Sequence, residues 1–177
     1  MLIISREAAV KVGKHAWNVY PLEAFGYLLG RTAEGQVLAA LPCSKTRQWD
    51  VHDDRWNGIE EHFEQARIVA SSFGLEVVGV YGTTQDHPEK YPIPRFVGPA
   101  MLVMLYRTFC CPSCSWFAFR HEGRLLERRE DFTVCRGKRL DSAVSQRRIL
   151  KAWREIYGQV DYSNQARLLM EETTHED

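Results

Sequence analysis

An aspartate and a histidine lie side by side just after a short apolar run. Asp86 and His87 follow the run 77–81, Val-Val-Gly-Val-Tyr, and precede Pro88. A buried strand that leads into a polar loop is a common way to hold a catalytic or metal-binding side chain at the edge of a sheet. The sequence therefore predicts a functional site in the loop that follows residue 81.

The five cysteines are an odd number, which argues against a complete set of internal disulfides. Three of them form the turn 110–114, Cys-Cys-Pro-Ser-Cys. A redox pair is one interpretation, but such a motif should open a helix, whereas residues 115–119 have the pattern of a strand. Half of a zinc knuckle is another, but it needs a second ligand pair, and Cys43 and Cys135 are each isolated. Free thiols in a hairpin turn are the simpler interpretation.

The composition is that of a soluble globular chain, and 177 residues suffice for one domain with a full core. Lys plus Arg and Asp plus Glu both number 23, so no net field favours nucleic acids or anionic membranes. The longest uncharged apolar stretch, 96–106, is too short to span a bilayer. The apolar start of the chain ends at Arg6, too early for a secretory signal. We therefore expect a cytoplasmic protein without nucleic-acid or membrane partners.

Hydrophobic periodicity predicts an alternation of helices and strands. The expected elements are a helix over 6–19, strands over 25–29 and 37–41, a helix over 58–72, strands over 77–81, 99–107, 116–120 and 124–129, and a helix over 141–157. Ser5 and Asn57 are the expected N-caps of the first two helices. Gly26 and Gly79 are expected in strands that pack closely against helices. This order predicts an α/β sandwich with a mixed sheet flanked by helices.

A shift in composition divides the chain into a domain over 1–135 and a helical extension with an acidic tail over 136–177. Asp141 is the expected cap of the long helix in the extension. Its apolar stripe consists of Val144, Ile149, Trp153 and Ile156. An isolated helix of this length is marginal in water, so another surface must cover the stripe. Because the elements before residue 135 already account for a complete sandwich, a partner or a second copy of the chain is the favoured cover.

Three stretches together resemble the JAB/MPN family, which includes the JAMM zinc metalloproteases. They are the segment 21–30, Pro-x-Glu-x-x-Gly-x-Leu-Leu-Gly, the strand 77–81, and the strand 115–119, Ser-Trp-Phe-Ala-Phe. The resemblance covers about residues 1–132 and implies a JAB/MPN-like sandwich of the cytidine-deaminase-like type. It also implies a zinc ion held by two histidines and an aspartate, and a glutamate that moves the proton of the zinc-bound water. The implied substrates are peptide or isopeptide bonds near the C terminus of ubiquitin-like or sulfur-carrier proteins.

The ligand pattern of that family is largely replaced in this chain. The two histidine positions fall on Gly82 and Thr84 when the alignment starts from Tyr81, and on Gln85 and His87 when it starts from the His-Pro pair. The family's serine and aspartate positions then fall on Arg95 and Gly98. At best Glu23, the proton-moving residue of the resemblance, and His87 survive. One imidazole cannot hold a catalytic zinc that needs three protein ligands. Replacement ligands would have to come from Asp86 or from the neighbouring His52, Asp53 and Cys43.

The sequence thus predicts a JAB/MPN-like domain with an eroded zinc site that serves as a non-catalytic binding or scaffold module without a cofactor. A ubiquitin-like or sulfur-carrier protein is the expected kind of partner, and a second copy of the chain is a further one. The expected pocket consists of Gly82, Thr83, Thr84, Asp86 and Arg95. The alternative is a divergent zinc metallopeptidase or isopeptidase in which Glu23 is the base and His87 is one of the ligands.

Overall fold

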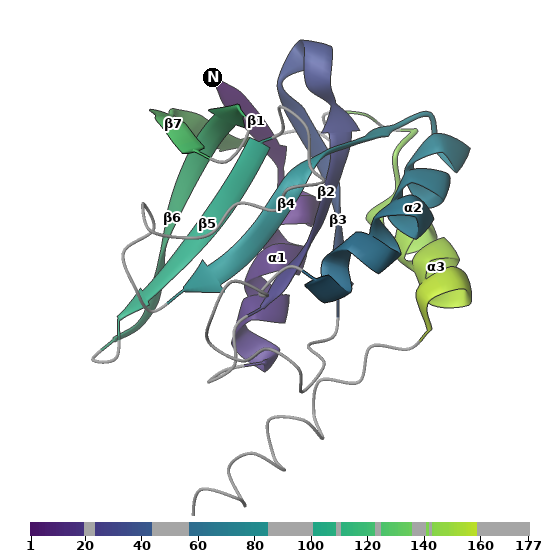
Figure 1. Cartoon of the computed structure of the whole chain (residues 1–177), viewed down its shortest axis with the longest axis horizontal. Coiled ribbons are helices and arrows are strands. Elements are labelled where there is room, and N and C mark those ends of the chain that lie inside the picture. The colour runs from purple at the N-terminus through teal and green to yellow at the C-terminus, as the bar shows by residue number, and fades with distance from the viewer. Residues whose placement is uncertain are drawn as a thin grey trace, which may run out of the picture.

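The computed structural model describes residues 1–19, 24–43, 57–84, 101–108, 111–122, 125–135, 141 and 143–158, and the structural statements below concern these residues. Three α-helices are interspersed among the strands (Figure 1). In chain order they are β1 (Leu2–Ser5), α1 (Arg6–Asn18), β2 (Phe25–Arg31), the 3-10 helix η1 (Thr32–Glu34), β3 (Gln36–Cys43), α2 (Asn57–Ser72), β4 (Glu76–Thr84), β5 (Met101–Thr108), β6 (Cys111–Glu122), β7 (Leu125–Glu130), β8 (Phe132–Cys135) and α3 (Gln146–Tyr157). No helix in these parts of the chain is long and apolar enough to cross a membrane.

One eight-stranded sheet runs through the molecule in the order β7-β6-β5-β4-β2-β3-β1-β8. β2 pairs antiparallel with β3 and β4, whereas β4 and β5 are parallel, as are β1 and β3. The α/β class and the mixed sheet predicted from the sequence are therefore confirmed. The two edge strands, β7 and β8, are joined by the single residue Asp131. The sheet must consequently curve until its two ends meet at that residue.

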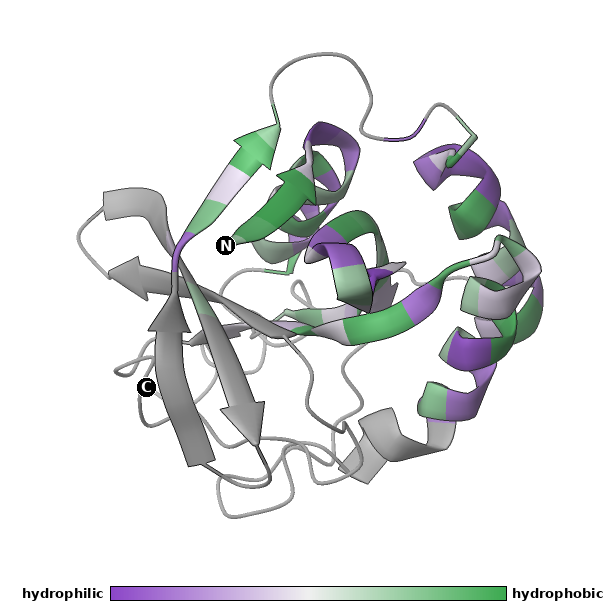
Figure 2. Ribbon diagram, turned by 90° about the horizontal axis from the view of Figure 1, so that it is seen from above, coloured by the Kyte–Doolittle hydropathy of each residue, from purple (hydrophilic) through white to green (hydrophobic). Residues whose placement is uncertain are grey.

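The helices pack on both faces of this sheet (Figure 1). On one face, Ala8, Val12 and Ala16 of α1 share a buried cluster with strand residues such as Leu28 and Tyr81. On the other face, α2 and α3 share a second cluster with the alternate residues of the same strands. That second cluster includes Tyr27, Leu29, Ala66, Val69, Val80, Ile149 and Trp153. Figure 2 shows hydrophobic and hydrophilic residues alternating along the helices, as amphipathic helices require.

Most predicted elements are confirmed within a few residues, including the cap of α1, whose Ser5 side chain accepts a hydrogen bond from Ala8 N. Two short strands, β1 and β8, were not predicted. The expected cap of α3 is wrong: Ser145 caps this helix, with its side chain accepting from Arg148 N. Asp141 instead accepts a hydrogen bond from Ala143 N and pairs with Arg31.

The expectation that a partner covers the α3 stripe is wrong for its central residues. Ile149 and Trp153 are 0% and 1% exposed, and Trp153 Nε1 donates to Pro42 O at 2.8 Å. Ile156 remains 42% exposed because it lies on the outer side of the helix. Helix α3 therefore covers the domain's own sheet. The division of the chain after residue 135 stays a prediction based on composition. Residues beyond it, such as Ile149 and Trp153, pack in the same core as the residues before it.

Gly26 and Gly79 lie in strands as expected, but the close neighbour of Gly26 is not a helix. A Cβ at Gly26 would overlap Leu41 O and stand 2.7 Å from the Tyr81 ring. Tyr81 is fully buried, and Trp116 is half-buried against the same cluster. The small residue at position 26 thus lets the Tyr81 ring lie directly on the backbone of β2.

Candidate functional site

The predicted site lies at the carboxyl end of β4, where β2 begins beside it. Phe25 pairs with Gly82 of β4 and with Cys43 of β3. On the other side of β4, Thr84 pairs with Tyr106 of β5. Because β4 and β5 are parallel, their carboxyl ends reach the same edge of the sheet. The start of β2 and the ends of β3, β4 and β5 therefore gather at one edge.

A pair of hydrogen bonds ties the chain just after Glu23 to this edge. The buried Thr83 Oγ1 accepts a hydrogen bond from Ala24 N at 2.6 Å, and Thr83 N donates to Ala24 O at 2.8 Å. Ala24 directly follows Glu23 in the sequence. The fold thus brings position 24 beside the end of β4, as a site built from Glu23 and the loop after β4 would require.

The structure places part of the predicted site and leaves the rest outside the described residues. Gly82, Thr83 and Thr84 form the end of β4, and the first two are buried. Cys111 and Cys114 lie in β6, where the sequence predicted a turn. Glu23, Gln85, Asp86, His87, Arg95, Gly98, His52, Asp53 and Cys110 lie outside the described residues.

The first ligand position of the alignment from Tyr81 does not fit a zinc site. Gly82 offers no side-chain ligand atom, and the hydroxyl of its neighbour Thr83 accepts a hydrogen bond from Ala24 N. Burial raises the pKa of the Cys43 thiol well above its usual value, so the thiolate that a metal needs is disfavoured there. Among the described residues, no group of three or more His, Cys, Asp or Glu side chains could hold a metal ion.

A buried histidine and tyrosine, which the sequence analysis missed, lie next to this edge. His15 Nδ1 is 2.6 Å from the Tyr81 hydroxyl, and the two rings meet edge to face. Burial, together with the charge of Lys11, lowers the pKa of His15 to about 3. The imidazole is therefore neutral at physiological pH and anchors α1 to β4. The only sequence signal was the position of His15 beside Ala16 on the apolar face of α1.

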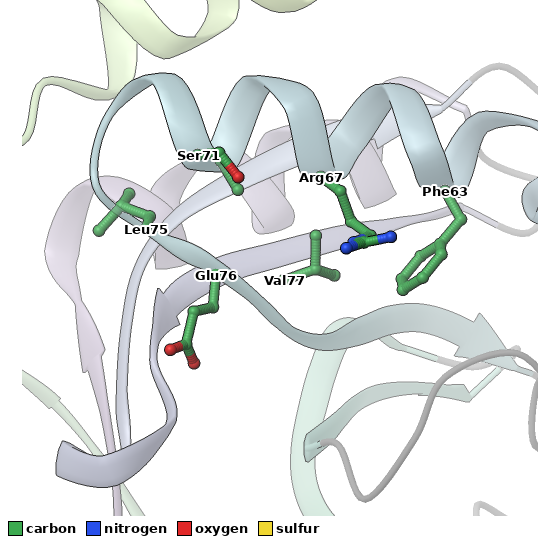
Figure 3. Close-up of a pocket in the computed structure, with 7 residues that line it drawn as sticks. Phe63, Arg67, Ser71, Leu75, Glu76 and Val77 are labelled. Atoms are coloured by element: carbon green, nitrogen blue, oxygen red, sulfur yellow. The ribbon is translucent and has the colours of Figure 1, made fainter.

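A pocket of about 250 Å³ lies at the other end of β4, beneath α2 (Figure 3). It is lined by Phe63, Arg67, Ala70, Ser71, Leu75, Glu76 and Val77. The Arg67 guanidinium pairs with Glu64 at 2.8 Å, and the Glu76 carboxylate accepts from Thr32 Oγ1 at 2.6 Å. In Figure 3 the Glu76 carboxylate points away from Arg67. Both charges are engaged by protein groups, so this pocket offers a weaker site than the edge at Thr83.

No known family matches the chain by its sequence, and no curated protein matches it either. Two of the solved structures that the chain resembles were determined in solution. A protein from Desulfitobacterium hafniense is 15% identical, with a TM-score of 0.53 over 77% of this chain and 94% of that chain. A protein from Salinibacter ruber is 23% identical, with a TM-score of 0.49 over 78% of this chain and 94% of that chain. The first likeness shows a shared fold alone.

Proposed function

We propose that this chain is a JAB/MPN-like domain whose zinc site is eroded and which serves as a non-catalytic binding module for a protein partner. The observation that carries the proposal is the end of β4. There, Gly82 pairs with Phe25 and has no side chain that could bind a metal. The hydroxyl of Thr83 already accepts a hydrogen bond from Ala24 N. A hydrolytic site needs an open metal position and three protein ligands, which these residues do not supply.

Support for the kind of partner comes from the sequence pattern rather than from a contact. The segment 21–30 and the strand 115–119 resemble a family whose substrates end in flexible ubiquitin-like or sulfur-carrier tails. Such tails bind in extended form, with main-chain hydrogen bonds supplying affinity. In this proposal the protein is cytoplasmic and binds such a tail near Phe25 and Thr83, at the sheet edge where β4 ends.

Metal analysis tests the non-catalytic half of the proposal. The full chain, purified without chelators and then exposed to zinc, should hold well below one zinc per chain after desalting. Chelators should leave its melting temperature unchanged, because a folded state that binds no metal gains nothing from metal by mass action. His87→Ala should give the same values. One tightly held zinc per chain that disappears in His87→Ala would instead establish the divergent metallopeptidase with Glu23 as its base.

Titration with ubiquitin tests the binding half. Amide resonances of Phe25, Gly82 and Thr83 in the ¹⁵N-labelled chain should shift on addition of ubiquitin. In the Glu23→Gln variant, ubiquitin should shift the same resonances to the same extent, because a module that only binds needs no proton transfer from this carboxylate. The absence of shifts with both ubiquitin and a sulfur-carrier protein, at millimolar concentration, would contradict the proposed partner class.

A further inference from the structure

The outer edge of β3 is covered by two helices rather than by a strand over most of its length. β1 pairs with β3 only at Gln36 and Val37. Beyond them, the Gln146 side chain of α3 accepts a hydrogen bond from Ala40 N at 2.8 Å and donates to Ala40 O at 2.9 Å. Ser5, the cap of α1, donates its hydroxyl hydrogen to Leu38 O at 2.8 Å. The starts of α1 and α3 are therefore fixed to neighbouring positions of one strand.

Both helices then run along β3 toward its carboxyl end. Helix α3 reaches Pro42 through the Trp153 indole. Helix α1 must end near Cys43, because Val19 precedes Ala24 by only five positions and Phe25 pairs with Cys43. Lys14 lies nine residues past Ser5, about 13 Å along the helix. Pro42 lies four residues past Leu38, also about 13 Å along the strand. Lys14 and Arg154 consequently stand at a similar level of β3.

Three cations gather where the two helices flank this strand. Lys11 is half-buried, and Lys14 and Arg154 are exposed. Burial lowers the pKa of Lys11, and the charges of Arg154 and Lys14 lower it further. Arg154 on α3 therefore acts electrostatically on a lysine of α1. We call Lys11, Lys14 and Arg154 the basic surface.

We propose that the acidic segment Glu171–Asp177 of the same chain docks on the basic surface. This interaction is independent of the proposed binding site at Thr83. The segment reads Glu-Glu-Thr-Thr-His-Glu-Asp and carries four carboxylate side chains in seven residues. Carboxylates close to Lys11 and Arg154 offset the mutual repulsion of these cations. The neutral net charge of the whole chain therefore hides two opposite local charges that complement each other.

The length of the connection permits this docking. Glu171 follows Gly158 by 13 positions. Thirteen residues can span at most about 45 Å. Helix α3, with its 12 residues, is about 18 Å long, so the segment can return along the whole helix. A short tether of this kind gives a millimolar effective concentration, so individually weak charge pairs suffice.

Zero-length crosslinking of the full chain tests the proposal. A carbodiimide joins a carboxylate to a lysine amine only when the two are in contact, so peptide mapping reports which pairs meet. At low salt, Lys11 or Lys14 should crosslink to Glu171, Glu172, Glu176 or Asp177. The yield should fall several-fold at high salt, because exposed charge pairs are screened. A mixture of ¹⁴N- and ¹⁵N-labelled chains should show the crosslinks within single chains.

Arg154→Glu is the informative variant, because it reverses one charge of the basic surface and keeps both reactive lysines. The crosslink yield should fall several-fold. Arg67→Glu on α2 makes the same charge change at an exposed residue outside the basic surface and should leave the yield unchanged. Circular dichroism would establish that both variants are folded. The proposal is wrong if the wild type forms no such crosslinks, if Arg154→Glu forms them equally well, or if they join only differently labelled chains.

Discussion

At the scale of single residues, the fold depends on glycine where two strands and a ring approach each other. A methyl group at Gly26 would overlap Leu41 O and the Tyr81 ring, which belong to the two neighbouring strands of β2. Gly26→Ala should therefore destabilise the protein by about 3 kcal/mol or more. The measurement is the free energy of unfolding in urea.

Gly13 is the matched control, since it lies within α1 and a Cβ there would meet nothing within 4 Å. Gly13→Ala should stabilise the protein by about 0.5–1 kcal/mol, because alanine favours the helix over the unfolded chain. If both substitutions changed the free energy of unfolding equally, the backbones of β2 and β3 would be able to move apart at position 26 at little cost.

The residue scale is also where sequence reasoning reached its limit. The resemblance predicts that the chain next to Glu23 lies near the loop after β4, and the structure places Ala24 beside Thr83 at the end of β4. It could not find the contact between His15 and Tyr81, because these residues are 66 positions apart and neither type is unusual in its own element. Contacts over such distances depend on the register of β2 with β4, which hydrophobic periodicity does not specify.

At the scale of elements, α3 is held by Trp153. This indole is buried against the ring of Tyr27, stacks on Tyr157 and donates to Pro42 O. Trp153→Ala should cost about 3–5 kcal/mol, because it leaves a large cavity and an unpaired carbonyl. Urea unfolding followed by circular dichroism would measure the loss.

Ile156→Ala is the control from the same predicted stripe. Ile156 is 42% exposed, so its truncation should change stability by about 0.5 kcal/mol or less. If instead the Ile156 variant changed the oligomeric state and the Trp153 variant remained as stable as the wild type, α3 would serve a partner after all.

The elements show what a periodic pattern can and cannot predict. The predicted stripe correctly indicated a helix whose buried face carries Ile149 and Trp153, whereas Val144 precedes α3 and Ile156 is exposed. The pattern does not say which surface buries this face, and the core before residue 135 is incomplete without α3, whose Ile149 and Trp153 belong to it. The strands β1 and β8 have only four residues each, too few for a periodic signal. Their pairing with each other depends on the curvature of the whole sheet.

At the scale of the whole molecule, the curved sheet packs around the buried face of α1. The cluster around α1 includes Leu2 of β1, Leu28 of β2 and Ala118 of β6, which are well separated in the strand order. Asp131 joins the two outermost strands, and its carbonyl accepts from Leu2 N at 2.9 Å. His15 is 2% exposed between α1 and the sheet, so its protonation is coupled to opening of this packing.

This coupling predicts how stability depends on pH. The pKa of His15 is about 3 in the folded protein and about 6.5 when unfolded. Between these values the unfolded chain binds a proton that the folded chain excludes, so stability falls as the pH is lowered from 6.5 toward 3. From pH 7 to 4.5 this residue should contribute a loss of about 2–3 kcal/mol. His15→Gln can still bond the Tyr81 hydroxyl but does not titrate, so its urea unfolding free energy should decline less over the same range, by about that amount. Parallel declines for the two proteins would mean that His15 becomes protonated without opening the fold.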